Sequence, residues 1–124
     1  MGRHAVKILV AEGNDLLAEA IADLFAEANG GLPVLTARSV AEAVTIVRHE
    51  RPDLVLLDHR IGRENVESAV RDLRASSPKS AVIVITTGVD DALVSRMKAL
   101  GARCVEKDLL HDAAPTILDS VRGK

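Results

Sequence analysis

Aromatic residues are almost absent from this chain of 124 residues, in which Phe25 is the one phenylalanine and there is no tryptophan or tyrosine. Proteins that bind single-stranded nucleic acids stack the bases on several aromatic rings, so this class is excluded. The charge balance agrees, because 16 Lys and Arg against 18 Asp and Glu give a formal charge of −2. With no basic surplus to bind a phosphate backbone, we expect no direct contact with nucleic acid.

Cysteine and long apolar runs are also scarce. Cys104 is the single cysteine, so no disulfide can form within the chain, and no Cys/His cluster has the spacing of a zinc site. No stretch approaches the roughly 18 consecutive apolar residues of a membrane-spanning helix. The first residues lack the apolar segment and cleavage site of a secretory signal. We therefore expect a reduced thiol, no membrane association and a cytoplasmic location.

The length and composition are those of one globular domain. Hydrophobic residues make up 48% of the chain and charged residues 27%, which argues against intrinsic disorder. A chain of this length can bury a core without disulfides or metals. We expect residues 1–124 to form a single domain.

Short apolar runs recur along the chain and predict the strands of a sheet. Three of them are continuous and rich in β-branched residues, as is typical of strands buried on both faces of a parallel sheet. They lie at 8–11, 54–57 and 82–85, and weaker candidates lie at 34–36 and 102–106.

The segments between these runs have helical periodicity. Apolar stripes with spacings of three and four occur in 17–28, 66–73, 93–100 and 110–121. Ser39 and Glu42 form a capping box that predicts the start of a further helix. Five strands alternating with five helices predict an α/β fold, a single doubly wound (βα)5 domain with a helix layer on each face of the sheet.

Several residues mark the expected helix ends. Gly30, Gly31 and Gly101 lie where left-handed C-caps would end the first and fourth helices. Asp15 is expected to cap the first helix. Pro115 is expected in the first turn of the last helix, where its missing N–H costs nothing.

Polar residues follow four of the five predicted strands. In open parallel sheets the ligand site lies beyond the carboxyl ends of the strands. Glu12 follows the first strand, Asp58 the third, Thr86 the fourth and Lys107 the fifth. The sequence therefore predicts two carboxylates, a hydroxyl and an ammonium group at one edge of the sheet.

The segments that carry these residues resemble the receiver domain of two-component response regulators, which has a CheY-like, flavodoxin-like fold. The resemblance covers 7–12, 52–58, 82–86 and 101–102 followed by Lys107, in order along the whole chain. It implies a sheet order of 2-1-3-4-5 and identifies Asp58 as the phosphoacceptor. It also implies signal transduction by phosphorelay, with a histidine kinase or phosphotransfer protein as the phosphoryl donor.

Chemical considerations agree with the roles that this resemblance implies. A carboxylate that attacks a phosphoryl group approaches an anion, so cations must neutralise both groups. Lys107 supplies an ammonium and Thr86 a hydroxyl that donates to a phosphoryl oxygen. The resemblance implies Mg²⁺ as cofactor, held by Asp58, by Glu12 directly or through water, and by the main-chain carbonyl of Arg60.

The chain departs from the family pattern at several positions. Gly13 stands where the family has a second acid after the first strand, so we expect weakened Mg²⁺ binding. The family's Met-Pro after the phosphoacceptor is replaced by 61–62, and the proline after the lysine by Asp108. The aromatic switch position of the fifth strand falls on Cys104 or Val105.

Two alternatives belong to other functional classes. A degenerate pseudo-receiver would serve as a protein-interaction module independent of phosphorylation, and Gly13 motivates that hypothesis. Flavodoxin-like carriers share the fold, but no Gly-rich nucleotide motif is present and His59 is one position early for a corrinoid ligand. We expect a signalling domain that is not an enzyme, with an effector domain or downstream protein as partner and a homodimer as an open alternative.

Overall fold

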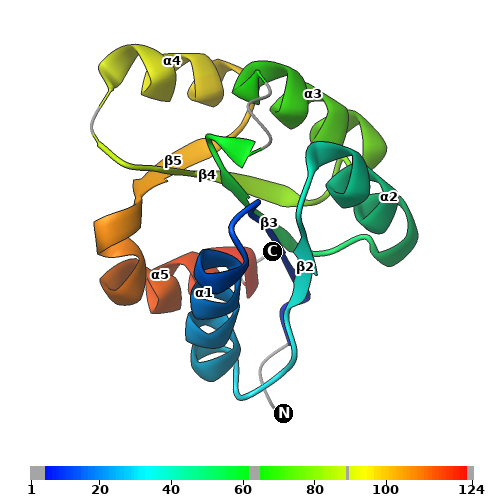
Figure 1. The fold of residues 1–124 in the computed structure, drawn as a ribbon, viewed down its shortest axis with the longest axis vertical. Helices are drawn as coiled ribbons and strands as arrows, with labels where there is room; N and C mark the ends of the chain where they lie inside the picture. Colours follow the sequence, from blue (N-terminus) through cyan, green and yellow to red (C-terminus); the bar gives the residue numbers. More distant parts are fainter. Residues whose placement is uncertain (1–4, 62–64, 89, 123–124) are drawn as a thin grey trace.

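The computed structural model describes residues 5–61, 65–88 and 90–122. Five strands alternate with five α-helices along the chain (Figure 1). The elements are β1 (Ile8–Ala11), α1 (Asp15–Ala28), β2 (Leu35–Ala37), α2 (Val40–Glu50), β3 (Leu54–Asp58), α3 (Val66–Ser76), β4 (Ala81–Thr86), α4 (Asp91–Ala99), β5 (Arg103–Glu106) and α5 (Leu110–Arg122), with a 3₁₀ helix (Lys107–Leu109) before α5.

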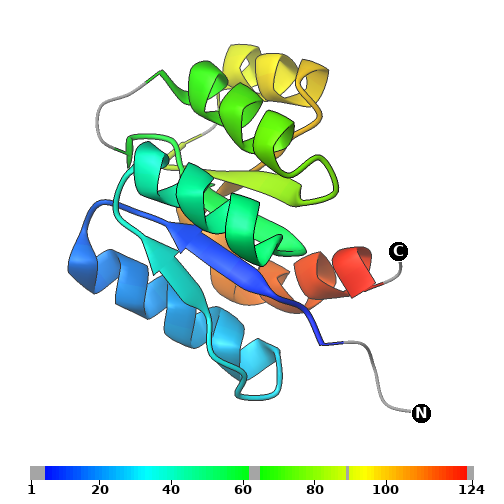
Figure 2. The same ribbon diagram turned by 90° about the vertical axis from the view of Figure 1, so that its right-hand side faces the viewer.

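The strands form one parallel sheet in the order β2-β1-β3-β4-β5, which confirms the predicted α/β fold and strand order. Figure 2 shows the sheet between two layers of helices, with α1 and α5 on one face and α2, α3 and α4 on the other. Crossover connections that place helices on both faces are the usual solution for parallel strands, because neither face of such a strand can remain in water.

Each face of the sheet carries its own apolar core. Alternate residues of β3 go to opposite sides: Leu56 packs into the cluster with Phe25 of α1 and Leu118 of α5, whereas Leu57 packs into the cluster with Val70 of α3. All of these side chains are fully buried. The period of two along a strand therefore divides one continuous apolar run between two cores.

The predicted N-cap of α2 at Ser39 is confirmed, but the side chain of Glu42 binds the backbone N–H of Arg38 instead of that of Ser39. Ser39 Oγ accepts a hydrogen bond from Glu42 N at 3.1 Å, and Glu42 Oε1 accepts one from Arg38 N at 2.7 Å, one residue before the N-cap. The prediction for α1 was wrong: Asn14 is the N-cap, with Oδ1 accepting from Leu17 N at 3.0 Å. Asp15 begins the helix and forms an ion pair with Arg38 Nε at 3.0 Å.

The ends of α4 and α5 were predicted with different success. Gly101 has φ +81°, so it is the left-handed residue after α4 that the sequence predicted. Pro115 lies at the sixth residue of α5 rather than in its first turn, because the helix begins at Leu110. The missing N–H leaves the carbonyl of the exposed His111 without an intrahelical donor, and water can replace that donor there.

One residue other than glycine has a positive φ within the described part of the chain. Arg51 ends α2 with φ 45° and ψ 60°, and its N–H donates to Val47 O at 3.0 Å. This left-handed conformation costs a side-chain-bearing residue about 1–2 kcal/mol, whereas glycine adopts it freely.

We therefore expect Arg51→Gly to stabilise the protein by about 0.5 kcal/mol, since the relief of strain exceeds the added entropy of the unfolded chain. Urea unfolding followed by far-UV circular dichroism measures the change. Arg48→Gly is the matched control: Arg48 is exposed within the same helix, so glycine there costs about 1 kcal/mol. A loss of stability in Arg51→Gly similar to that in Arg48→Gly would contradict the argument.

Candidate functional site

The register of the sheet brings the ends of four strands to one level. Ala11 pairs with Leu57, so Glu12 lies beside Asp58 on the neighbouring strand. Asp58 pairs with Ile85, and Ile85 pairs with Val105. Neighbouring strands lie about 4.8 Å apart, so the predicted polar residues emerge from adjacent positions at the same edge.

The alternation of side chains places these residues on two faces. Asp58 follows the periodicity of Leu56, which faces α1 and α5. Lys107 lies just beyond β5, at the start of the 3₁₀ helix that follows this strand. Thr86 follows Val84 and so belongs to the face covered by α2, α3 and α4. The edge is therefore shared by side chains that approach from both layers.

Asp58 is buried at the end of the central strand, with 6% of its surface exposed. Its Oδ2 accepts a hydrogen bond from Arg60 N at 3.2 Å, which closes a tight turn after β3. Within the described part of the chain, no hydrogen bond reaches Oδ1. One carboxylate oxygen is thus held by the backbone, whereas the other receives no hydrogen bond from a described residue.

His59 folds back over β4 instead of pairing with Asp58. Its N–H donates to Ile85 O at 3.1 Å, and its ring Nδ1 lies 3.0 Å from the same carbonyl oxygen. Because a carbonyl only accepts, Nδ1 carries the proton. The distance from Nδ1 to Asp58 Oδ1 is 3.9 Å, beyond hydrogen-bond range. The ring therefore anchors the turn to β4.

Glu12 is also buried, with 5% of its surface exposed. Its Oε2 accepts from Asn14 N at 2.9 Å, which sets the loop before α1. Its Oε1 is buried without a hydrogen-bond partner, the only such side-chain atom among the described residues. A buried, unpaired carboxylate oxygen is costly unless a cation or water completes its coordination.

This donor set fits a magnesium ion, but only narrowly. Mg²⁺ prefers oxygen ligands, and the carboxylates of Glu12 and Asp58 supply them beside the main chain of Arg60. Gly13 adds none, and within residues 5–61, 65–88 and 90–122 no group of three His, Cys, Asp or Glu residues lies close enough to hold a metal. A bound Mg²⁺ would therefore take most of its ligands from water.

Thr86 and Lys107 lie at the predicted edge, but their polar atoms do not contact Asp58. Thr86 is buried and its Oγ1 donates to Gly88 O at 3.1 Å, in the loop before α4. Lys107 is partly buried in the 3₁₀ helix after β5, and its ammonium forms no ion pair with a described residue. The structure thus places both residues around Asp58 without bonding them to it.

A contact that the sequence did not suggest crosses this edge. Arg60 Nη2 donates to Thr87 Oγ1 at 3.2 Å and so joins the loop after β3 to the loop after β4. The two residues are 27 positions apart and share no periodic pattern, so nothing in the sequence indicated that their side chains would meet.

The fold and the site together are those of receiver-like signalling domains. The central strand of a five-stranded parallel sheet ends in a buried aspartate, and a second acid, a threonine and a lysine lie at the ends of other strands. The model of the family described as "Response regulator receiver domain" matches residues 8–116. The chain belongs to this family, and it is a receiver domain of two-component signal transduction. The resemblance drawn from the sequence is confirmed.

Curated relatives agree with the family match. The chain is 30% identical over 117 residues to the transcriptional regulatory protein LnrK of Bacillus subtilis, covering 94% of this chain and 52% of that protein. It is 33% identical over 93 residues to sporulation initiation phosphotransferase F of the same organism, covering 74% and 69%. Response regulator GacA of Pseudomonas aeruginosa is 29% identical over 78% of this chain and 45% of its own length. The chain thus spans about half the length of the first relatives.

Solved structures show the same fold. The receiver domain of the response regulator NarL from Mycobacterium tuberculosis matches with a TM-score of 0.84 at 22% identity, covering 98% of this chain and 99% of that one. A response regulator from Thermotoga maritima matches with a TM-score of 0.82 at 23% identity, covering 98% and 100%. Among the described residues, no helix has the length and apolarity to cross a bilayer.

Cys104 occupies one of the two positions to which the sequence assigned the aromatic switch. It pairs with Val84 across the sheet and is half-buried against the core on that face. Burial raises the pKa of its thiol, and the carboxylate of Asp90 raises it further. A thiolate, the reactive form, is therefore scarcer at neutral pH than for an ordinary cysteine.

We expect alkylation of Cys104 by iodoacetamide to rise with pH at a midpoint above that of the urea-unfolded chain. Intact-mass spectrometry against time gives the rate, and no other cysteine contributes. Asp90→Asn should lower the midpoint in part while keeping the cap of α4, where Oδ1 accepts from Leu93 N. Equal midpoints in the folded and unfolded chains would contradict the burial effect.

Proposed function

We propose that Asp58 accepts a phosphoryl group from a histidine kinase or phosphotransfer protein and that the added charge changes the partner-binding face. The observation that carries this proposal is the buried pair of carboxylates at adjacent strand ends, in which Glu12 Oε1 has no hydrogen-bond partner and Asp58 Oδ1 receives no hydrogen bond from a described residue. A buried acid oxygen without a partner, such as Glu12 Oε1, is costly for stability, and a site for cation-assisted chemistry would account for it.

The transfer makes one bond and breaks one. An oxygen of Asp58 attacks the phosphorus atom, and the bond from phosphorus to the donor's imidazole nitrogen breaks, with its electron pair returning to the imidazole. Mg²⁺, when bound, supplies positive charge that reduces the repulsion between the carboxylate and the phosphoryl oxygens. Glu12, Asp58 and the carbonyl of Arg60 are the residues that would hold it.

Lys107 and Thr86 are the residues that we propose contact the phosphoryl group on Asp58. The ammonium of Lys107, which forms no ion pair with a described residue, is available to a phosphoryl oxygen on Asp58. Thr86 can exchange its bond to Gly88 O for a bond to the phosphoryl group, which would alter the loop between β4 and α4. A group with a charge of about −2 can reorganise loops through contacts of this kind.

The wider assignments belong to this proposal as well. We propose that residues 1–124 act as one receiver domain in the cytoplasm and in a phosphorelay. In this proposal the domain is not an enzyme in its own right. Its partner is an effector domain or a downstream protein, and a homodimer of the domain is one possible oligomeric state. Response regulators such as LnrK and GacA are roughly twice as long as the matched region, which supports an effector partner.

Phosphorylation can be tested without the cognate kinase. We expect acetyl phosphate or phosphoramidate with Mg²⁺ to add one phosphoryl group, seen by intact mass, and the addition to disappear in Asp58→Asn because the nucleophile is lost. Asp108→Asn is the matched control, since it removes an exposed carboxylate near the same edge. No addition to the wild-type chain, or undiminished addition to Asp58→Asn, would overturn the proposal and favour a phosphorylation-independent module.

Magnesium affinity can be tested at Gly13. A Cβ atom at this position would meet Arg38 O at 3.6 Å, an ordinary contact, so larger residues fit. We expect Gly13→Asp to tighten Mg²⁺ binding about tenfold by adding a carboxylate beside Glu12. The chain lacks tryptophan and tyrosine, so calorimetry or amide chemical shifts serve as the measurement.

Gly13→Asn is the control for that experiment because it has nearly the same shape as aspartate and no charge. It should bind Mg²⁺ about as weakly as the wild-type chain. If Gly13→Asp bound Mg²⁺ no more tightly than Gly13→Asn, the missing acid would not be what limits metal affinity.

A further inference from the structure

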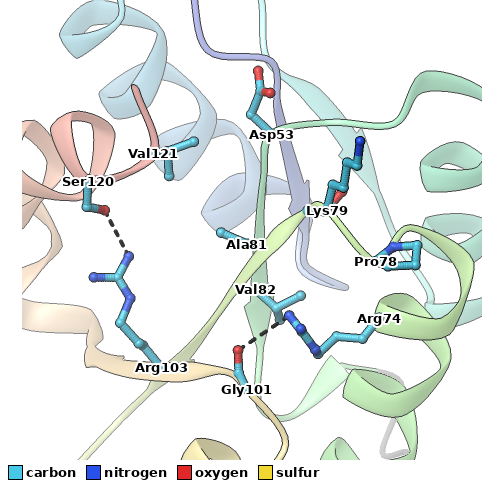
Figure 3. Close-up of a pocket in the computed structure, with 11 residues that line it drawn as sticks. Asp53, Arg74, Pro78, Lys79, Ala81, Val82, Gly101, Arg103, Ser120 and Val121 are labelled. Atoms are coloured by element: carbon cyan, nitrogen blue, oxygen red, sulfur yellow. Dashed lines mark hydrogen bonds between the residues drawn. The ribbon is translucent and has the colours of Figure 1, made fainter. Parts of the chain in front are cut away.

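A groove of about 540 Å³ lies at the opposite end of the sheet from Asp58. It is bounded by the beginnings of β4 and β5, the end of α3 and the last turns of α5 (Figure 3). Asp53, which lines it, precedes β3, whereas Asp58 ends that strand. The two residues are about 16 Å apart at 3.3 Å per residue. The groove is therefore separate from the candidate phosphorylation site.

The groove concentrates positive charge on a chain with an overall charge of −2. Three cationic side chains line it, namely Arg74, Lys79 and Arg103, against the single carboxylate of Asp53, which leaves a formal charge of +2 from 3 − 1. Within the described ranges none of the three cations forms an ion pair with a carboxylate. Asp53 is itself engaged, because its Oδ2 accepts from Lys7 N at 2.8 Å.

The guanidinium of Arg74 is seated on the backbone of Gly101. Its Nη1 donates to Gly101 O at 3.4 Å (Figure 3). A Cβ atom at residue 101 would lie 3.1 Å from both Cζ and Nε of Arg74, and φ at this residue is +81°. The missing side chain therefore lets the half-buried guanidinium lie against the main chain, where its orientation is limited.

The guanidinium of Arg103 is held from the other side. Its Nη2 donates to Ser120 Oγ at 3.0 Å, and Ser120 Oγ donates in turn to Ile117 O at 2.7 Å in α5. Figure 3 shows Arg74 and Arg103 on opposite sides of the start of β4. Each guanidinium uses one nitrogen for its anchor, and its other N–H groups donate to no described residue, so they are available to a ligand.

We propose that this groove is a binding site for a small anionic molecule whose phosphate or carboxylate groups lie between Arg74 and Arg103, with Lys79 at the rim. Guanidinium groups bind both kinds of anion through paired hydrogen bonds, and anchoring them beforehand lowers the entropy lost on binding. The volume lies within the range of small-molecule sites. Both phosphate and carboxylate groups can form these paired hydrogen bonds, and the experiment below distinguishes which of the two anions the groove binds more tightly.

The test uses the whole chain labelled with ¹⁵N, in buffer with a chelator and no Mg²⁺, titrated separately with inorganic phosphate and with citrate. Sodium chloride at matched ionic strength is the reference. We expect saturable shifts of the amides around Val82, Gly101 and Arg103, with a dissociation constant of about 1 mM or tighter for at least one anion. The tighter anion identifies the group that the site prefers.

Variants locate the binding. Arg103→Gln and Arg74→Gln should each weaken it about tenfold, because each removes charge-assisted hydrogen bonds. Arg48→Gln is the matched control, an exposed arginine of α2 outside the groove, and should bind as the wild-type chain does. Asp58→Asn should also bind unchanged, which separates this site from anion binding at the phosphorylation edge.

Some outcomes would overturn the proposal. These are shifts reproduced by sodium chloride, no saturation up to about 10 mM of either anion, or equal losses in Arg48→Gln and Arg103→Gln. If Arg74→Gln perturbs the fold, as amide spectra without ligand would reveal, Arg103→Gln and Lys79→Gln keep the test decisive because both positions are exposed.

Discussion

Burial of the parallel sheet on both faces is the constraint from which the candidate site follows. The interior of β3 from Leu54 to Leu57 is fully buried, so each of these positions must be apolar. Polar side chains are tolerated only where a strand ends and the backbone turns out of the sheet. Of the six buried polar residues described, three are Glu12, Asp58 and Thr86 at the carboxyl ends of strands.

The other three buried polar residues show what a purely structural role looks like. Asn29 Nδ2 donates to Val6 O at 2.7 Å, and Ser77 and Ser80 bond to each other, with Ser80 also donating to Pro52 O. All are satisfied by protein groups and lie away from Asp58. Glu12 differs, because one of its oxygens is buried without a partner. That contrast separates the candidate site from ordinary buried polarity.

The strand order was predicted from the resemblance to receiver domains, whereas the residues at the strand ends were predictable from the apolar runs themselves, because these runs depend on local composition. The cap of α1 was not, since Asn14 and Asp15 are adjacent residues with similar capping preference. In the structure, Asn14 Oδ1 accepts the capping hydrogen bond from Leu17 N, while Asn14 N donates to Glu12 Oε2. The choice of cap therefore depends on how the short loop after β1 folds around Glu12.

Side-chain direction was the other limit of prediction. The sequence places Thr86 and Lys107 at the correct edge, but the choice of Thr86 Oγ1 between Gly88 O and Asp58 depends on how the loop before α4 folds. In the same way, Arg74 and Arg103 have no periodic relation in the sequence. They become neighbours of one groove because α3 and β5 both pass the start of β4.

The two ends of the sheet differ in how deeply their charged side chains are buried. At the carboxyl ends, Glu12 and Asp58 are buried on adjacent strands, where a bound cation would offset their negative charge. At the amino ends, Arg74 and Arg103 reach in from α3 and β5 on long side chains that remain partly in water, so their charges carry little desolvation cost. A bound cation would therefore stabilise the buried carboxylates at one end, whereas the partly solvated guanidinium groups at the other end can take up an anion without rearrangement of the core.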